Sequence, residues 1–108
     1  MDALTSTETA LDVDLMRRNA EKACRMMKTL ANRDRLLLLC QLSQGEKRVG
    51  ELEEITQIQQ PTLSQQLAVL REENVVSTRR DGKHIYYSIS SPIAMSVMEL
   101  LYATYCGN

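Results

Sequence analysis

The sequence predicts a mainly α-helical domain with a β-hairpin wing, in the arrangement of a winged helix-turn-helix. Three observations lead to this fold class. Residues 49–73 predict two helices joined by a tight turn, residues 75–90 predict a hairpin, and the segment from Ser91 predicts a closing amphipathic helix. A chain of 108 residues with 44% hydrophobic residues forms one domain with a modest core. Dimerisation through a helical surface would bury more apolar area.

The chain is expected to start with a flexible acidic tail over residues 1–14, followed by the folded domain over residues 15–106. The tail is acidic and rich in Ser and Thr, which favours mobility. It lacks the basic and apolar regions of a secretory signal, and no apolar run reaches the roughly 20 residues that span a membrane. We therefore expect a cytoplasmic protein with no membrane contact and reduced thiols.

Two helices are predicted before the central pair. Residues 15–31 carry apolar side chains at three- and four-residue intervals, namely Ala20, Ala23, Met27 and Leu30. Asn32 suits the N-cap of the second helix, which is expected to end near Gly45. Four consecutive leucines, Leu36 to Leu39, predict that this second helix is buried nearly all round.

The second helix of the central pair combines an apolar stripe with a polar, uncharged face. Leu63, Leu67 and Leu70 recur at i, i+4 and i+7 and so share the stripe. At about 100° per residue, the opposite face and its flanks hold Thr62, Ser64, Gln65, Gln66 and Val69. Gln can pair with adenine through two hydrogen bonds, and Ser or Thr suits several base edges, so this face is suited to reading DNA. An ordinary amphipathic helix hairpin is the alternative for this segment taken alone.

A basic wing follows the central pair. The strand pattern of residues 75–90 alternates every two residues around Asp81-Gly82, a strong hairpin signal. The tip gathers four basic side chains: Arg79, Arg80, Lys83 and His84. Beside a polar recognition helix, we expect these side chains to contact DNA phosphates or the minor groove. The net charge of −1 does not oppose this, because residues from 15 onward hold 13 basic and 10 acidic side chains.

The closing helix is predicted from a start signal and from the apolar stripe that follows it. Ser91 and Pro92 form an N-cap and N1 pair. An apolar stripe with helix–helix spacing follows, made of Ala94, Met98, Leu101 and Tyr105.

These segments resemble the ArsR/SmtB family of bacterial winged-helix repressors over residues 16–106. The resemblance is carried by LANRDRLLLL (30–39), VGELEEITQIQQPTLSQQLAVLREENVV (49–76) and STRRDGKHIYYSIS (77–90). The string QPTLSQQLAVLRE and the terminal YATYC (102–106) are most similar to the family's thiol-based, persulfide-responsive subgroup. The resemblance implies a homodimer, built largely from the first and last helices, that binds an inverted repeat in double-stranded operator DNA and represses transcription.

The metal sites of the family are missing from this sequence. Many relatives carry a Cys-Val-Cys triplet where this chain has Arg48-Val49-Gly50, and others bind zinc between their last helices through acidic residues and His. Here the last helix offers only Glu99, and the single His of the chain is His84 in the wing. We therefore expect no metal and no cofactor.

The resemblance gives two cysteines a regulatory role. Cys40 and Cys106 match the subgroup's paired cysteines, and this match implies that a polysulfide or disulfide links them in response to a sulfane-sulfur donor and releases the DNA. Taken alone, Cys40 also fits a small core residue, and Cys106 a terminal thiol without a role. Cys24 is interpreted as a packing residue, with a role in modifying redox behaviour or in pairing across the dimer as the alternatives.

Three other functions compete with this interpretation. The first keeps the DNA-binding role, but its inducer is a general oxidant or electrophile, or it has no inducer, as in virulence regulators of similar sequence. A winged helix that binds protein rather than DNA is a further alternative. An enzyme is not expected, because the sequence has no Cys-x-x-Cys, no Gly-rich phosphate loop and only one His.

Overall fold

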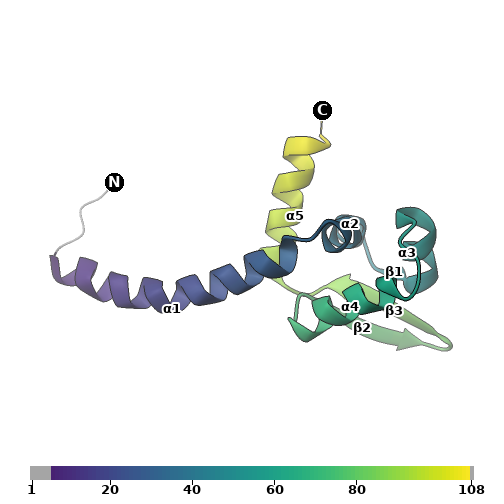
Figure 1. Ribbon diagram of the computed structural model, residues 1–108, viewed down its shortest axis with the longest axis horizontal. Helices are drawn as coiled ribbons and strands as arrows, with labels where there is room; N and C mark the ends of the chain where they lie inside the picture. Colours follow the sequence, from purple (N-terminus) through teal and green to yellow (C-terminus); the bar gives the residue numbers. More distant parts are fainter. Residues whose placement is uncertain (1–5, 108) are drawn as a thin grey trace.

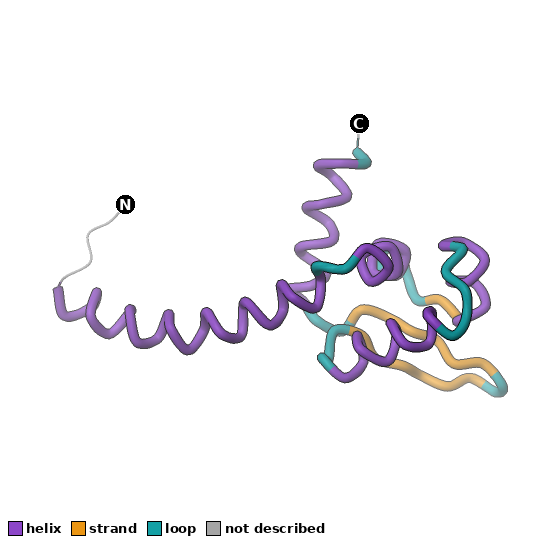
Figure 2. The backbone as a smooth tube through the Cα atoms, viewed as in Figure 1, coloured by secondary structure: helices purple, strands orange, loops and turns teal. Residues whose placement is uncertain are grey.

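The computed structural model describes residues 6–107, in which five helices and a three-stranded antiparallel sheet form a winged helix-turn-helix (Figures 1 and 2). The predicted fold class is confirmed. In chain order the elements are α1 (Ser6–Leu30), α2 (Arg33–Leu42), β1 (Lys47–Arg48), α3 (Val49–Thr56), α4 (Thr62–Glu72), β2 (Val76–Asp81), β3 (His84–Ile89) and α5 (Pro92–Tyr105). No helix in this part of the chain is long and apolar enough to cross a membrane.

Helix α1 begins earlier than the sequence pattern predicted. Its backbone is helical from Ser6, so residues 6–14 of the expected tail form its first turns, while residues 1–5 lie outside the described part of the chain. The range 6–30 holds no Gly or Pro, and nothing in it interrupts a helix once formed. The prediction placed the start of this helix at residue 15 because it interpreted the acidic composition of residues 1–14 as a sign of mobility, and this start is too late.

Leucine side chains from four helices, α1 to α4, make up most of the core. The predicted stripe of α4 is buried, and it faces leucines of α2 and α3 across the interior. The largest fully buried side chains are Leu38, Leu39, Leu42, Leu52, Leu63, Leu67, Leu70 and Val75. In a core without Phe or Trp, leucine thus supplies most of the large buried side chains, and Ile58, Val75, Val76, Ala94 and Met98 complete the cluster.

Helix α2 is only partly buried, so the prediction of burial all round is wrong. Leu38 and Leu39 are fully buried, whereas Leu37 exposes 41% of its surface and Leu36 is half-buried. The reason is that Leu37 lines an open apolar cleft between α2 and α5, and Leu36 lines this cleft while also packing against the core.

The predicted caps of α2 and α5 are confirmed. The side chain of Asn32 accepts a hydrogen bond from the Arg35 backbone N–H at 3.0 Å, and Ser91 Oγ accepts from the Ala94 N–H at 3.1 Å. Pro61 lies at the N-cap of α4.

The wing is a hairpin extended by a third, very short strand. Strands β2 and β3 pair from Val76 opposite Ile89 to Asp81 opposite His84, so the turn is Gly82-Lys83 and lies one residue later than Asp81-Gly82. Gly82 has φ of 64°, a left-handed conformation that suits glycine. The two-residue strand β1, too short for any sequence pattern, pairs with β3 and joins the wing to the start of α3.

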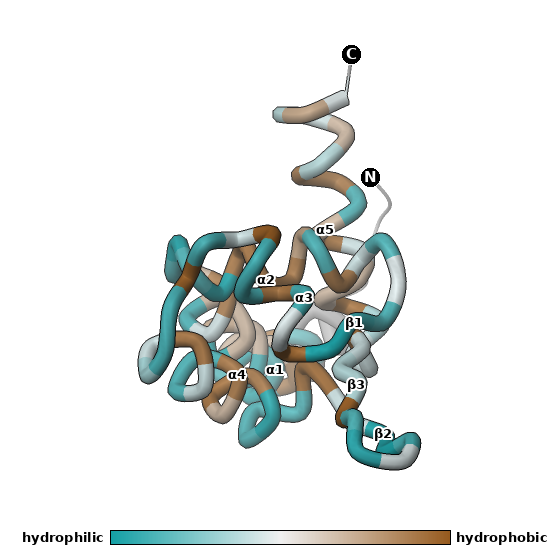
Figure 3. The backbone as a smooth tube through the Cα atoms, turned by 90° about the vertical axis from the view of Figure 1, so that its right-hand side faces the viewer, coloured by the Kyte–Doolittle hydropathy of each residue, from teal (hydrophilic) through white to brown (hydrophobic). Residues whose placement is uncertain are grey.

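Two helices extend beyond the body of the protomer. Figure 1 shows the first half of α1 and the end of α5 projecting away from the other elements, and Figure 3 shows apolar residues along the projecting part of α5. The radius of gyration is 17.2 Å, against about 13 Å for a compact domain of this length. Large apolar side chains on these helices stay exposed, among them Met16, Met27, Ile93, Leu100 and Tyr105.

We predict that neighbouring leucines of α2 differ sharply in their contribution to stability. Leu38→Ala should lower the free energy of unfolding by about 2–5 kcal/mol, because it opens a cavity in the core. The matched change Leu37→Ala should cost about 1 kcal/mol or less, since that side chain is already 41% exposed. Urea unfolding at one protein concentration measures both, and equal losses would contradict the burial described for α2.

Candidate nucleic-acid interface and cysteine cleft

The exposed side of α4 carries polar side chains that a ligand can reach. Thr62, Ser64 and Gln65 are exposed, and we call these three residues the reading face. Gln65 makes no side-chain hydrogen bond within the described part of the chain, so its amide can serve as both donor and acceptor. Ser64 Oγ donates to Gln60 Oε1 at 2.7 Å.

Gln60 is a residue of this region that sequence reasoning missed. Its Oε1 also accepts from the backbone N–H of Ser64 at 3.2 Å, which satisfies one of the unpaired donors at the start of α4. The sequence analysis missed Gln60 because a capping side chain at this position, just before Pro61, follows no regular spacing pattern.

Gln66 lies apart from the reading face. It is half-buried, and its Oε1 accepts a hydrogen bond from Arg35 Nη1 at 2.8 Å. Of the four α4 side chains predicted to contact DNA, the structure therefore leaves three exposed and ties the fourth to α2.

The reading face lies beside the wing. Ser64, Ala68 and Arg71 of α4 line one hollow of about 320 Å³ together with Tyr87 of β3. Figure 3 shows the wing projecting from the body with a hydrophilic tip. A single ligand can thus touch α4 and the wing at the same time.

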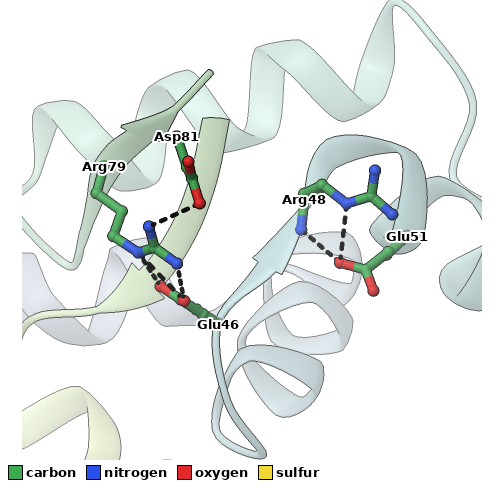
Figure 4. Close-up of polar contacts among 5 residues, drawn as sticks. All are labelled: Glu46, Arg48, Glu51, Arg79 and Asp81. Atoms are coloured by element: carbon green, nitrogen blue, oxygen red, sulfur yellow. Dashed lines mark hydrogen bonds and ion pairs between the residues drawn. The ribbon is translucent and has the colours of Figure 1, made fainter. Parts of the chain in front are cut away.

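Arg79, predicted at the basic tip, is instead engaged by an acidic partner (Figure 4). Its Nε donates to Glu46 Oε2 at 2.9 Å and its Nη2 donates to Glu46 Oε1, while its guanidinium lies 4.5 Å from the centre of the Tyr86 ring. This hydrogen bonding holds the pKa of the Glu46 carboxyl below its usual range. Glu46 precedes β1, so the pair ties β2 to the strand on the other side of β3.

The remaining basic residues of the wing are available. Arg80, Lys83 and His84 are exposed, and no ion pair to them occurs among the described residues. A second polar contact in Figure 4 serves the fold, because Glu51 Oε1 accepts from the Arg48 backbone N–H at 2.8 Å and caps the start of α3.

Cys40 and Cys106 line the same open apolar cleft of about 620 Å³ between α2 and α5, which we call the cysteine cleft. Cys40 is half-buried in α2, and Cys106 is exposed at the C-cap of α5. Burial raises the pKa of the Cys40 thiol, and the charge of a nearby Cys106 thiolate raises it further. The walls are apolar, with Leu36, Leu37, Met98, Leu101, Tyr102 and Tyr105 among the lining residues.

Cys24 does not take part in this arrangement. It is exposed on α1 and does not line the cysteine cleft, so its interpretation as a packing residue is wrong for the protomer. Among the described residues, no three His, Cys, Asp or Glu side chains are grouped so that they could hold a metal ion.

Comparisons relate the chain to known bacterial proteins. The family described as "Bacterial regulatory protein, arsR family" matches residues 32–78. The chain is 49% identical over 92 residues to a biofilm growth-associated repressor of Agrobacterium fabrum, with 85% of this chain and 79% of that protein covered.

Solved structures of similar proteins share the fold. The crystal structure of the transcriptional repressor BigR from Xylella fastidiosa is 44% identical, with a TM-score of 0.79 over 86% of this chain and 92% of that one. The structure of reduced HlyU from Vibrio cholerae is 40% identical, with a TM-score of 0.81 over 84% of this chain and 96% of that one.

We predict that Cys40 reacts with iodoacetamide more slowly than the exposed Cys24 at pH 7.5, because a raised pKa leaves less thiolate. Its rate should keep rising with pH beyond the ordinary thiol range. Cys106→Ser should lower the midpoint of that rise without restoring the ordinary value, since burial, the larger cause, remains. Mass spectrometry of each labelled cysteine measures the rates. An unchanged midpoint in Cys106→Ser would show that the two thiols do not interact.

Proposed function

Because the chain belongs to the ArsR family of bacterial regulatory proteins, we propose that it is a transcriptional repressor that binds an inverted-repeat operator as a homodimer. The observation that carries this proposal is the exposed, uncharged polar face of α4 beside a wing with free basic side chains. Relatives whose names describe repressors support it.

Each part of the interface meets a different part of the DNA. The reading face enters the major groove, where the free amide of Gln65 pairs with a base edge, adenine being the best match. Arg80, Lys83 and His84 lie at the wing, where their charges meet the phosphate backbone or the minor groove. Base recognition and charge neutralisation are therefore divided between α4 and the wing.

A homodimer is supported by the apolar surface that the protomer leaves uncovered. Helices α1 and α5 extend from the body and expose Met16, Met27, Ile93 and Leu100. Contact between these helices in two copies buries that surface and presents two α4 helices on one side. Half-sites about 34 Å apart then bind one copy each.

Control of the repressor is proposed to lie in the cysteine cleft. One thiolate attacks the sulfane sulfur of a donor RSSH, which forms a protein persulfide and releases the thiol RSH. The second cysteine attacks the inner sulfur of that persulfide, closes a disulfide and releases hydrogen sulfide. When both cysteines are persulfidated first, the same displacement leaves a trisulfide, which spans a wider gap than the roughly 7 Å between Cα atoms that a disulfide allows.

Such a link acts on the dimer through α5. It ties the C-terminal end of α5 to α2, and α5 also carries the exposed apolar side chains expected at the dimer contact. A shift of α5 changes the distance between the two α4 helices, and a coupling of about 1–3 kcal/mol suffices to lower operator affinity 5- to 150-fold.

We predict that Arg80 and Arg79 differ in their effect on DNA binding. Arg80→Ala should weaken binding to all sequences and reduce the slope of log affinity against log salt by about 1, because a free phosphate contact is lost. Arg79→Ala should leave the slope nearly unchanged, since Glu46 already neutralises that guanidinium. Anisotropy titrations between 50 and about 200 mM salt measure the slope. Equal slopes in the two variants would contradict this division of the wing.

We predict that an organic persulfide releases the wild-type protein from operator DNA and leaves Cys40→Ser and Cys106→Ser bound. Both cysteines are needed because the link joins them across the cleft. Cys24→Ser is the matched control and should respond like wild type, since Cys24 lies outside the cleft. Mass spectrometry should detect a covalent link between Cys40 and Cys106, either a disulfide or a polysulfide with additional sulfur atoms between the two cysteine sulfurs.

Release from operator DNA by peroxide and by electrophiles is compared with release by the organic persulfide. Equal release by peroxide would assign the switch to general oxidants, and no release by any agent would assign the chain to regulators without a small-molecule inducer. Absent or salt-insensitive DNA binding by the reduced protein would instead favour a protein-binding winged helix.

A further inference from the structure

Arg35, in the first turn of α2, joins three elements through one side chain. Its Nε donates to the Thr29 carbonyl at 2.6 Å, and its Nη2 donates to the Lys28 carbonyl at 3.2 Å. Both carbonyls belong to the last turn of α1, where they lack partners within the helix and where a cation is favourable. Its Nη1 donates to Gln66 Oε1 of α4 at 2.8 Å.

The chemistry of arginine fixes the orientation of the Gln66 amide. A guanidinium has only donors, so the oxygen of the amide must face Arg35 and the NH₂ group must point the other way. The Gln66 oxygen is therefore turned toward Arg35, and the NH₂ group is the part of the amide that is left to face a further partner. Gln65 next to it keeps both functions, as adenine pairing requires.

The place of Gln66 on α4 indicates which partner it meets. It lies on the flank of the helix, between the buried leucine stripe and the exposed reading face, and it is half-buried. A donor on the flank of a helix in the major groove faces the edge of the groove, where the phosphate oxygens accept hydrogen bonds.

We propose that Arg35 is a positioning residue that holds the Gln66 amide so that its NH₂ group donates to a backbone phosphate, and that it thereby sets α4 against α1 and α2. This inference rests on the proposed DNA-binding function. The sequence predicted that Gln66 reads bases. In this proposal it instead contacts a phosphate, so it raises the affinity for DNA of any sequence.

A second arginine, Arg25, also connects α1 to the end of α4, but its contact is more exposed than that of Arg35. Arg25 Nε and Nη2 donate to the two carboxylate oxygens of Glu73, just after α4, at 2.7 and 3.1 Å. The Arg25 side chain is largely exposed, and exposed ion pairs contribute little. Arg35 is half-buried, and its hydrogen bonds to Thr29 and Gln66 are partly shielded from water.

A double-mutant cycle tests the proposal on the reduced, full-length protein. The probe is a duplex that the wild type selects from a pool of random inverted repeats, with a scrambled duplex of equal composition beside it. Arg35→Lys keeps the charge and loses the planar set of guanidinium donors. Gln66→Met keeps the approximate volume of the side chain and loses the amide. Each should weaken binding to both duplexes about tenfold, and the double variant should also lose about tenfold because the second change removes nothing further.

Matched controls separate this coupling from general damage. Gln65→Met should lower the preference for the selected duplex, and combined with Arg35→Lys its loss should multiply with that of Arg35→Lys. Arg33→Lys, the same change at an exposed position two residues away, should stay within twofold of wild type.

Several results would overturn the proposal. Losses of Arg35→Lys and Gln66→Met that multiply, wild-type binding by Gln66→Met, or a loss of sequence preference in Gln66→Met would each do so. If Arg35→Lys fails to fold, Gln66→Met alone decides, with thermal unfolding as its check on the fold. Failure of the wild type to select any duplex would overturn the proposed function instead.

Discussion

Burial of Leu63, Leu67 and Leu70 against the leucines of α2 is the constraint on which the rest of the structure depends. These side chains fix the rotation of α4 about its axis, and the rotation decides that Gln65 faces outward and Gln66 lies on the flank. Because α2 supplies the opposite side of this core and also carries Cys40, the surface that reads DNA and the surface that holds the thiols share one set of packed leucines.

Elements with a strong local pattern could be predicted from the sequence. The leucine stripe of α4, the alternation of the wing and the caps at Asn32 and Ser91 all depend on residues within a few positions of one another. The start of α1 and the strand β1 could not, because a helix without a stop signal has no marked first residue and two residues carry no period.

Contacts between distant side chains account for what the site prediction missed. Arg35 and Gln66 are separated by 31 positions, and Arg79 and Glu46 by 33, so neither pair leaves a trace in local spacing. Counting charges at the wing could not show that one of them is neutralised. The cysteines illustrate the opposite case, because a resemblance to relatives suggested their partnership and the structure places both along one cleft.

The distribution of aromatic side chains has a spectroscopic consequence. The chain has four tyrosines and no tryptophan, so its ultraviolet emission comes from tyrosine alone. Tyr86 and Tyr87 lie in the wing, whereas Tyr102 and Tyr105 line the cysteine cleft. Unlabelled protein thus contains two groups of chromophores, one beside each functional surface. Replacing either pair by leucine would leave emission that reports on a single surface, without any added dye.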